Sequence, residues 1–152
     1  MDVVSSVKRS EMMSGIRGRN TRPELQVRAY LHARGLRFRL HRKDLPGRPD
    51  VVLPKYRVAV FVHGCFWHRH PGCKFTTEPA TREDFWRQKF AANVSRDLRN
   101  QEALLQAGWR VLVIWECGLK SKSSLEPTLE WIKGGQEDML VWPITKTADQ
   151  AS

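Results

Sequence analysis

The sequence predicts an α/β domain in which one mixed β-sheet is flanked by helices. Two β-branched apolar runs, at residues 56–63 and 109–117, have the pattern of buried strands. Between them, residues 81–108 show helical periodicity and end at a glycine. A long helical crossover normally connects parallel strands, whereas short turns connect antiparallel ones. The predicted sheet is therefore mixed, with helices covering its faces.

The first predicted helix begins after Thr21 and ends at Gly35. Thr21 is a favourable helix cap, Pro23 suits the first turn, and Glu24 follows the cap by three residues, as in a capping box. Gly35 is a typical helix terminator. Three short strands should follow as a meander. They are LRFRLHR (36–42), PDVVL (49–53) and YRVAVFVH (56–63).

The second half of the chain should supply a long helix, a fourth strand and a last helix. The helix at 81–108 is predicted to bend near Ala91, and the last helix should span residues 124–133. We expect a single domain over residues 1–143 that begins with a basic arm. Residues 144–152 should form a flexible tail.

Polar residues fall at the ends of three predicted strands. Asp50 opens the second strand, His63 ends the third, and Cys117 ends the fourth. Sites in such sheets gather at strand ends, so these side chains should converge.

Length and composition indicate an ordinary globular protein. The chain has 152 residues, of which 41% are hydrophobic and 28% charged. No apolar run approaches the roughly 20 residues that span a bilayer, so we expect no membrane association. The N-terminus lacks the pattern of a secretory signal, which indicates a cytoplasmic protein without disulfides. Its three cysteines are then metal ligands or buried thiols.

The positive charge is concentrated near the N-terminus. The first 48 residues contain twelve Lys or Arg and four acids, which accounts for +8 of the net charge of +10. Arginine binds phosphate in a bidentate way, so this segment indicates a nucleic-acid partner. A solvated surface is the plain alternative, and an anionic membrane fits less well because no helix has a clean apolar face.

The stretch FVHGCFWHRHPGC (61–73) concentrates the residues that carry chemistry. It contains Cys65, His70 and Cys73, and Cys117 could join them at the end of the fourth strand. Three thiolates and one imidazole suit a closed tetrahedral zinc site that would fix a loop without secondary structure. Buried free thiols are the competing interpretation, because this ligand spacing is uncommon.

Four other residues are catalytic candidates, and each has a structural alternative. His63 and His68 flank the zinc candidates, although a single histidine is more often structural than catalytic. Asp50 in GRPD could hold magnesium, or could bond its own backbone in a turn. Glu24 could support such a metal, or could serve only the capping box.

Three aromatic residues are candidates for DNA contact. Phe66 and Trp67 lie between the zinc candidates on what should be an exposed loop, and Trp86 begins the following helix. Most aromatic side chains belong to the core, and Trp86 alone would be placed there. Beside a basic surface, Phe66 and Trp67 could insert between base steps or stack on bases.

Several motifs together resemble the very short patch repair (Vsr) endonucleases, a family of bacterial DNA mismatch nickases. These are PGRPD, HGCFWH, the ATR and FW residues of ATREDFW, and GWRVL followed by WEC; the resemblance covers roughly residues 8–133. It implies a restriction-endonuclease-like fold, as a divergent member of the PD-(D/E)xK nucleases. It also implies a magnesium-dependent, strand-specific nick 5′ to the mispaired thymine of a T:G mismatch.

The resemblance also implies roles for individual residues. Asp50 would be the main ligand of the catalytic magnesium, expected as a pair of ions, with the Val62 backbone carbonyl as a second ligand. His63 and His68 would be catalytic, and Glu24 would be a supporting acid. The zinc ligands would be Cys65, His70, Cys73 and Cys117. The aromatic wedge would be Phe66, Trp67 and Trp86, and further positions near DNA or the catalytic histidines would be Met13, Arg19, Lys89, Asn93 and Asp97.

The chain departs from the family pattern in three places. Val62 stands where a threonine is familiar, and HRHPGC is one residue longer than the usual loop. The lysine that PD-(D/E)xK enzymes carry after their third strand is missing, because this position reads Phe61-Val62-His63. A histidine should then act as the base or as an electrostatic helper.

The expected partner is double-stranded DNA that contains a mismatch, in the bacterial cytoplasm at the nucleoid. A functional link to a cytosine-5 methyltransferase and to mismatch-repair proteins would follow from the resemblance. We expect a monomer, because nicking one strand needs no second subunit. Two alternatives are a non-catalytic, zinc-stabilised binder of distorted duplex and a restriction-like endonuclease that cuts intact sites.

Overall fold

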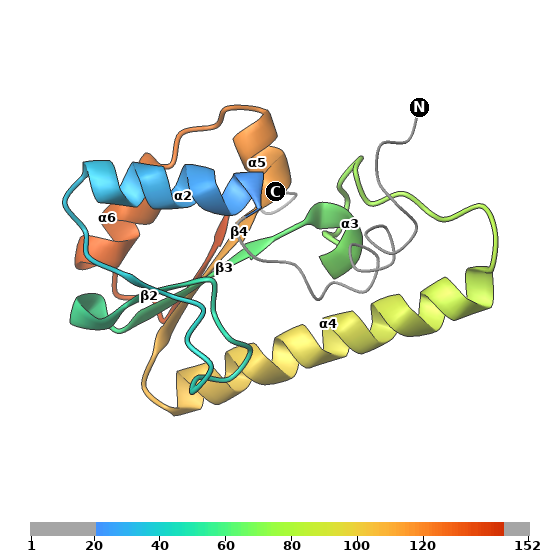
Figure 1. Cartoon of the computed structure of the whole chain (residues 1–152), viewed down its shortest axis with the longest axis horizontal. Coiled ribbons are helices and arrows are strands. Elements are labelled where there is room, and N and C mark those ends of the chain that lie inside the picture. The colour runs from blue at the N-terminus through green and yellow to red at the C-terminus, as the bar shows by residue number, and fades with distance from the viewer. Residues whose placement is uncertain (1–20, 145–152) are drawn as a thin grey trace, which may run out of the picture.

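The computed structural model describes residues 21–144, which form a five-stranded sheet with helices on both faces (Figure 1). The order of strands in the sheet follows their order in the chain, and the first two pairings are antiparallel and the last two parallel. The mixed α/β sheet predicted from the sequence is thus confirmed. The helices are α2 (Arg22–Ala33), α3 (Cys65–His68), α4 (Glu83–Gln106), α5 (Glu116–Lys120) and α6 (Glu126–Gly134). The strands are β1 (Arg39–Leu40), β2 (Val51–Leu53), β3 (Val58–His63), β4 (Arg110–Trp115) and β5 (Met139–Trp142), and a 3₁₀ turn at Pro54–Tyr56 joins β2 to β3.

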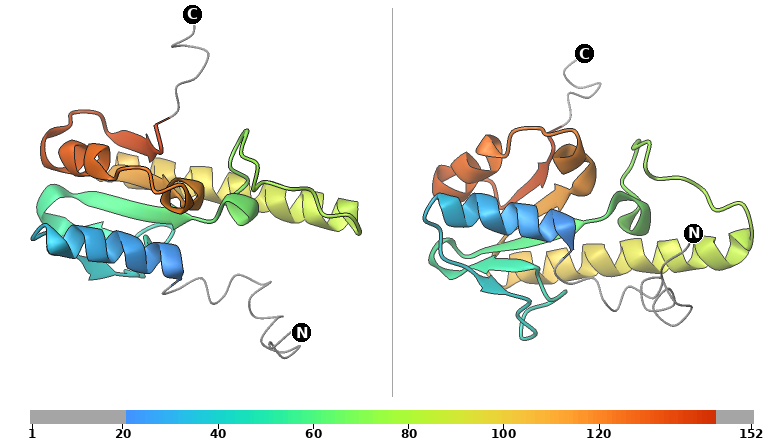
Figure 2. Two further views of the ribbon diagram at one scale, coloured as in Figure 1. Left: turned by 90° about the horizontal axis from the view of Figure 1, so that it is seen from above. Right: turned by 45° about the horizontal axis from the view of Figure 1, so that its top comes forward.

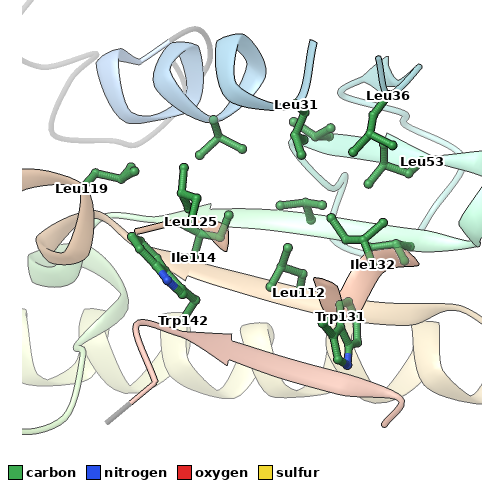
Figure 3. Close-up of a cluster of buried hydrophobic side chains, with 14 residues drawn as sticks. Leu31, Leu36, Leu53, Leu112, Ile114, Leu119, Leu125, Trp131, Ile132 and Trp142 are labelled. Carbon is green, nitrogen blue, oxygen red and sulfur yellow. The ribbon is translucent and has the colours of Figure 1, made fainter. Parts of the chain in front are cut away.

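The sheet separates two apolar clusters because successive side chains in a strand point to opposite faces. On β3, Val60 belongs to the cluster covered by α2, α5 and α6, whereas Phe61 belongs to the cluster covered by α4. Figure 2 shows these helices on either side of the sheet. In Figure 3, Leu31 of α2 and Ile132 of α6 lie over Leu112 and Ile114 of β4. His63 comes two residues after Phe61 on the same strand, so its side chain also points to the face covered by α4.

Helix α2 begins with the predicted capping box. The Thr21 hydroxyl accepts a hydrogen bond from the Glu24 N–H, and the Thr21 N–H donates to Glu24 Oε1, both at 3.3 Å. Glu24, Val27 and Leu31 form the buried face of the helix, since they follow the i, i+3, i+7 spacing of one helical face. The cap therefore carries a carboxylate into the interior, beside the sheet.

Helix α4 is the crossover between the parallel strands β3 and β4. It runs for 24 residues and continues through Ala91, where we predicted a bend. It ends just before Gly108, whose φ of +91° lies in the left-handed region that favours glycine. None of the helices among residues 21–144 is both long and apolar enough to cross a membrane.

Two strand predictions were wrong. The strand predicted at 36–42 pairs only at Arg39–Leu40, because its partner β2 is itself three residues long and offers few backbone groups at this edge. The prediction also missed β5, which pairs in parallel with β4 and places Trp142 in the core. Its four residues are too few to show a period, so only pairing with β4 defines them.

Two predictions around the cysteines also need correction. We predicted that the segment after His63 is a loop without secondary structure, but Cys65–His68 form the single helical turn α3. The fourth strand ends at Trp115, so Cys117 lies in α5 rather than at the strand end. The chain turns into α5 directly after Trp115, and this turn brings Cys117 back toward α3.

Candidate active site and metal clusters

Asp50 sits where β3 extends past β2. At this end of the β2–β3 pairing the last paired residues are Val51 and Val60, so the backbone of Val62 on β3 has no partner residue in β2. Its N–H donates instead to Asp50 Oδ2 at 2.7 Å. The N–H and C=O of one strand residue point to the same side, so the Val62 carbonyl is also directed toward Asp50. A ligand that uses its backbone carbonyl would tolerate valine here in place of threonine.

Glu24 and His41 also lie close to Asp50. One ligand atom from each of Glu24, His41 and Asp50 lies within 4.8 Å of the others, and we call these residues the acid–imidazole cluster. The Glu24 side chain is 1% exposed, and His41 Nε2 lies 3.5 Å from its Oε2. The backbone N–H of His41 donates to the Asp50 carbonyl at 3.3 Å, which fixes the histidine beside the acid.

A second cluster joins both predicted histidines to α4. The rings of His63 and His68 are stacked, with centroids 3.8 Å apart and planes 3° apart. His68 Nδ1 lies 2.6 Å from Asp97 Oδ2, which is a short, charge-assisted contact. The carboxylate favours a proton on Nδ1, so Nε2 is the atom of His68 that is free to exchange a proton.

Burial perturbs the chemistry of Asp50 and His63. Burial and the nearby Glu24 carboxylate raise the pKa of Asp50 well above its usual range, although the Val62 N–H acts in the opposite direction. Burial, with a smaller effect of His68, lowers the pKa of His63 well below its usual range. His63 is therefore neutral at neutral pH, and a cation beside Asp50 would restore the ionised form of that acid.

The predicted acid and both histidines open into one cavity. This cavity has a volume of about 240 Å³, and Asp50, Val62, His63, His68 and Asp97 are among the residues that line it. A cavity of this size accepts a phosphate group and several waters. The expected convergence at the strand ends is thus present for Asp50 and His63, and α3 and α4 complete it.

The predicted zinc ligands also meet. One ligand atom from each of Cys65, His70, Cys73 and Cys117 lies within 4.8 Å of the others. His70 Nδ1 is 3.6 Å from the Cys65 sulfur and 3.5 Å from the Cys117 sulfur. Zinc bonds of about 2.3 Å to sulfur and 2.0 Å to nitrogen at a tetrahedral angle put the two ligand atoms about 3.5 Å apart. The donor set and its spacing therefore fit zinc.

The cluster has supports from outside the ligand set. The His70 ring stacks on Trp115, with centroids 4.2 Å apart, and the Cys65 N–H donates to Glu116 Oε1 at 3.1 Å. Burial raises the pKa of the Cys65 and Cys117 thiols, so a metal cation would stabilise the thiolates that burial disfavours. Through these contacts the cluster ties α3, and with it His68, to the end of β4.

Phe66 and Trp67 are not on an exposed loop, which corrects the sequence prediction. Both belong to α3 and are half-buried, because they pack edge to face against Phe90 on α4. Trp86 joins the same cluster, with ring centroids 5.9 Å from Trp67. Phe85, at 44% exposure, extends the aromatic surface beyond these residues. Figure 1 shows α3 at the end of β3 and above α4.

The remaining predicted contact residues are only partly described. Lys89 and Asn93 are half-buried on α4, and the Asn93 side chain donates to the Trp67 carbonyl at 3.3 Å. Met13 and Arg19 lie outside the described residues. Sequence reasoning missed His41, because its place within an apparently alternating strand gave no sign of a partner in α2.

Comparisons with known protein sequences identify a family and several relatives of this chain. The sequence profile of the family described as DNA mismatch endonuclease Vsr matches residues 1–74. A type II nicking enzyme of Xanthomonas oryzae pv. oryzae, V.XorIIP, is 51% identical over 84% of this chain and 93% of its own length. The DNA mismatch endonuclease Vsr of Escherichia coli is 43% identical over 88% of each chain. V.NmeAIP, a type II nicking enzyme of Neisseria meningitidis, is 42% identical over 80% of this chain and 86% of its own.

Each match spans most of this chain and most of the relative's own length. All three relatives are named as DNA endonucleases or nicking enzymes. That agreement sets aside a non-catalytic DNA-binding module. The chain belongs to the Vsr family and is a DNA endonuclease.

Proposed function

We propose that this endonuclease nicks one strand of duplex DNA 5′ to the mispaired thymine of a T:G mismatch, with Mg²⁺ as cofactor. The observation that carries the proposal is the cavity in which Asp50, the Val62 backbone and the stacked His63 and His68 meet. Hydrolysis adds water across one phosphodiester bond and leaves a 5′-phosphate and a 3′-hydroxyl. The site therefore needs a proton acceptor for water and stabilisation for the departing 3′ oxygen.

The residues fit a divalent cation at this place. Glu24 Oε2 is buried without a hydrogen-bond partner among residues 21–144, and the hard oxygens of Asp50 and Val62 suit Mg²⁺. When bound, Mg²⁺ supplies positive charge that stabilises the phosphoryl oxygens and the leaving oxygen. Asp50 is held by the Val62 N–H, so its carboxylate is oriented before any ligand arrives.

The two histidines would handle protons. His68 keeps a proton on Nδ1 toward Asp97, so its Nε2 is free to take the proton from the attacking water, and solvent on the opposite side of the phosphorus protonates the leaving oxygen. His63 lies stacked on this ring and is neutral because of its lowered pKa. A neutral His63 does not repel the positive charge that His68 gains when it accepts a proton. This pair takes the place of the missing lysine.

Zinc at the Cys65, His70, Cys73 and Cys117 cluster would be structural. A closed set of four protein ligands leaves no coordination position for substrate. Its role is to hold α3, so that His68 and the aromatic residues keep their places.

Recognition of the mismatch would use the aromatic surface on α3 and α4. Phe66, Trp67 and Trp86 are half-buried, so parts of their rings remain available to DNA. A mismatched step is easier to unstack than a matched one, which lowers the cost of inserting a ring by a few kcal/mol. A deeply buried wedge could not act in this way.

The proposal is tested by nicking of a duplex with a single T:G pair and different labels on its two strands. We expect Mg²⁺-dependent cleavage of the thymine strand only, and none of the matched T:A duplex. Asp50→Asn should lower the rate at least about a hundredfold, because it removes the charged metal ligand. Asp44→Asn changes an exposed acid on the same loop and should cleave normally.

Equal cleavage of the matched duplex would instead indicate a restriction-like endonuclease for intact sites. Near-normal cleavage by Asp50→Asn would contradict the metal assignment.

A further inference from the structure

We propose that Arg48 binds the phosphate next to the scissile one on the nicked strand, and so holds that strand over the cavity. The inference rests on the proposed function, because it takes the cavity as the place of cleavage. Arg48 lines this cavity together with Asp50 and His63. Its side chain is exposed, so it can reach a ligand that enters from solvent.

The charges of the cavity give such a contact its purpose. Asp50 and Asp97 bring two carboxyl groups to the wall, and His63 is neutral at neutral pH. A cation at Asp50 would attract the scissile phosphate, but the next phosphate of the strand still faces an acidic wall. Of the lining residues within 21–144, Arg48 is the one lysine or arginine. Its guanidinium can hold phosphate oxygens through two parallel hydrogen bonds.

The guanidinium of Arg48 has no partner in the described part of the chain. The backbone N–H donates to the Leu45 carbonyl at 3.1 Å, but the side chain makes neither a hydrogen bond nor an ion pair within residues 21–144. Arg57 and Arg69 share its left-handed backbone, yet their guanidinium groups donate to the end of α4 and to an acidic side chain. Arg48, with φ of +47°, has the same unfavourable conformation without such a contact. An unfavourable backbone that presents an unused charge at a cavity is typical of a functional residue.

The backbone around Arg48 is held in place by its neighbours. Gly47 has φ of +78°, and a Cβ there would lie 2.9 Å from Asn100 Cβ and 3.1 Å from a Phe61 ring carbon. The loop is therefore pressed against α4 and β3. Pro49, on the other side of Arg48, is buried. Because the main chain is already fixed, binding a phosphate needs to order only the arginine side chain.

The separation of Arg48 from Asp50 indicates the neighbouring phosphate rather than the scissile one. Two residues of chain span at most about 7 Å, which is comparable to the separation of adjacent phosphates in one strand. The two side chains line the same cavity but form no ion pair with each other. A strand with its scissile phosphate at Asp50 therefore brings the next phosphate to Arg48.

The test combines a protein variant with a DNA variant. The phosphates on either side of the scissile one are replaced, one at a time, by a neutral methylphosphonate. Affinity of the full-length protein for each T:G duplex is measured without Mg²⁺, so that the DNA stays intact. One of the two replacements should weaken wild-type binding about tenfold. Arg48→Gln should bind the unmodified duplex about tenfold more weakly, and the same replacement should then cause little further loss.

Salt dependence and kinetics provide two further measurements. Losing one phosphate contact should reduce the slope of log affinity against log salt concentration by about one, equally for T:G and T:A duplexes. In single-turnover nicking with Mg²⁺, Arg48→Gln should raise the half-saturating protein concentration about tenfold, while the rate at saturation changes less. Arg48→Lys should keep the salt slope and recover part of the affinity, because it keeps the charge but not the paired donors.

Arg34→Gln is the matched control. It removes the same charge at the C-terminal end of α2, where the guanidinium lies over the Tyr30 ring. This variant should respond to each methylphosphonate as the wild type does, and thermal unfolding checks that every variant is folded. Additive losses from Arg48→Gln and from the methylphosphonate on both sides would overturn the proposal. So would a lower rate at saturation with unchanged affinity, because Arg48 would then act on the reacting phosphate.

Failure of this proposal is separable from failure of the nicking proposal. Additive losses, together with mismatch-dependent nicking by the wild type, reject only the role of Arg48. Non-additive losses at a phosphate beside the expected nick, without any mismatch-dependent nicking, reject only the T:G function.

Discussion

The contact between His68 and Asp97 provides the most direct test of the proposed proton transfer. The two atoms are 2.6 Å apart, and the side chains are 30% and 19% exposed. A hydrogen bond to a charged partner contributes about 1.5–3 kcal/mol, whereas a neutral one contributes about 0.5–1.5 kcal/mol. Asp97→Asn keeps an oxygen that can accept the Nδ1 proton, so it should lose only the difference, about 1–1.5 kcal/mol. Asp97→Ala should lose the full contribution.

These energies predict an order of rates. One factor of ten corresponds to about 1.4 kcal/mol, so Asp97→Asn should nick about tenfold more slowly than the wild type. Asp97→Ala should nick about 10- to 150-fold more slowly. The assay is a single-turnover measurement with protein in excess, which isolates cleavage from product release. Affinity for the duplex should change little, because Asp97 does not itself supply a positive charge for phosphate.

The matched control is Asp84→Asn, an exposed acid on α4 that pairs with Arg87. It should leave the rate unchanged, because the pair is far more exposed than His68 and Asp97. Thermal unfolding checks that each variant is folded. A folded Asp97→Ala protein that nicks at the wild-type rate would refute the role of Asp97 in orienting His68.

Three further predictions concern the zinc cluster, the aromatic surface and the packing of β5. Cys117→Ser should reduce the bound zinc measured by elemental analysis and lower the melting temperature, and full zinc content with unchanged melting would reject the clamp. Replacing Phe66 and Trp67 together by alanine should reduce the ratio of T:G to T:A duplex affinity more than it weakens binding of matched duplex; equal losses would argue against insertion. Gly118→Ala should destabilise the fold by about 1–3 kcal/mol in denaturant unfolding, because its new Cβ would lie 2.5 Å from a Pro143 ring carbon. Gly134→Ala, where a Cβ meets nothing within 4 Å, should be neutral or slightly stabilising.

The sequence determined the parts of this protein that depend on neighbours in the chain. Thr21 and Glu24 form the capping box because both partners lie within one helical turn. The buried strands around Val60 and Val113 were predictable because their apolar runs are continuous. The cysteine and histidine content near residue 65 likewise marks a candidate metal cluster, because these ligands are close together in the chain.

Tertiary structure alone decided the features that join distant segments. His41 reaches Glu24 only because the turn before β2 returns to α2, and the sequence holds no period that records this contact. Strand β5 forms because the edge of β4 that faces away from β3 has backbone N–H and C=O groups without partners, and the four residues of β5 supply those partners. Phe66 and Trp67 are half-buried because α4 passes beneath α3 and offers Phe90 as a partner. Hydrogen bonding and apolar burial between segments are satisfied only once the whole sheet has formed, so local patterns cannot specify them.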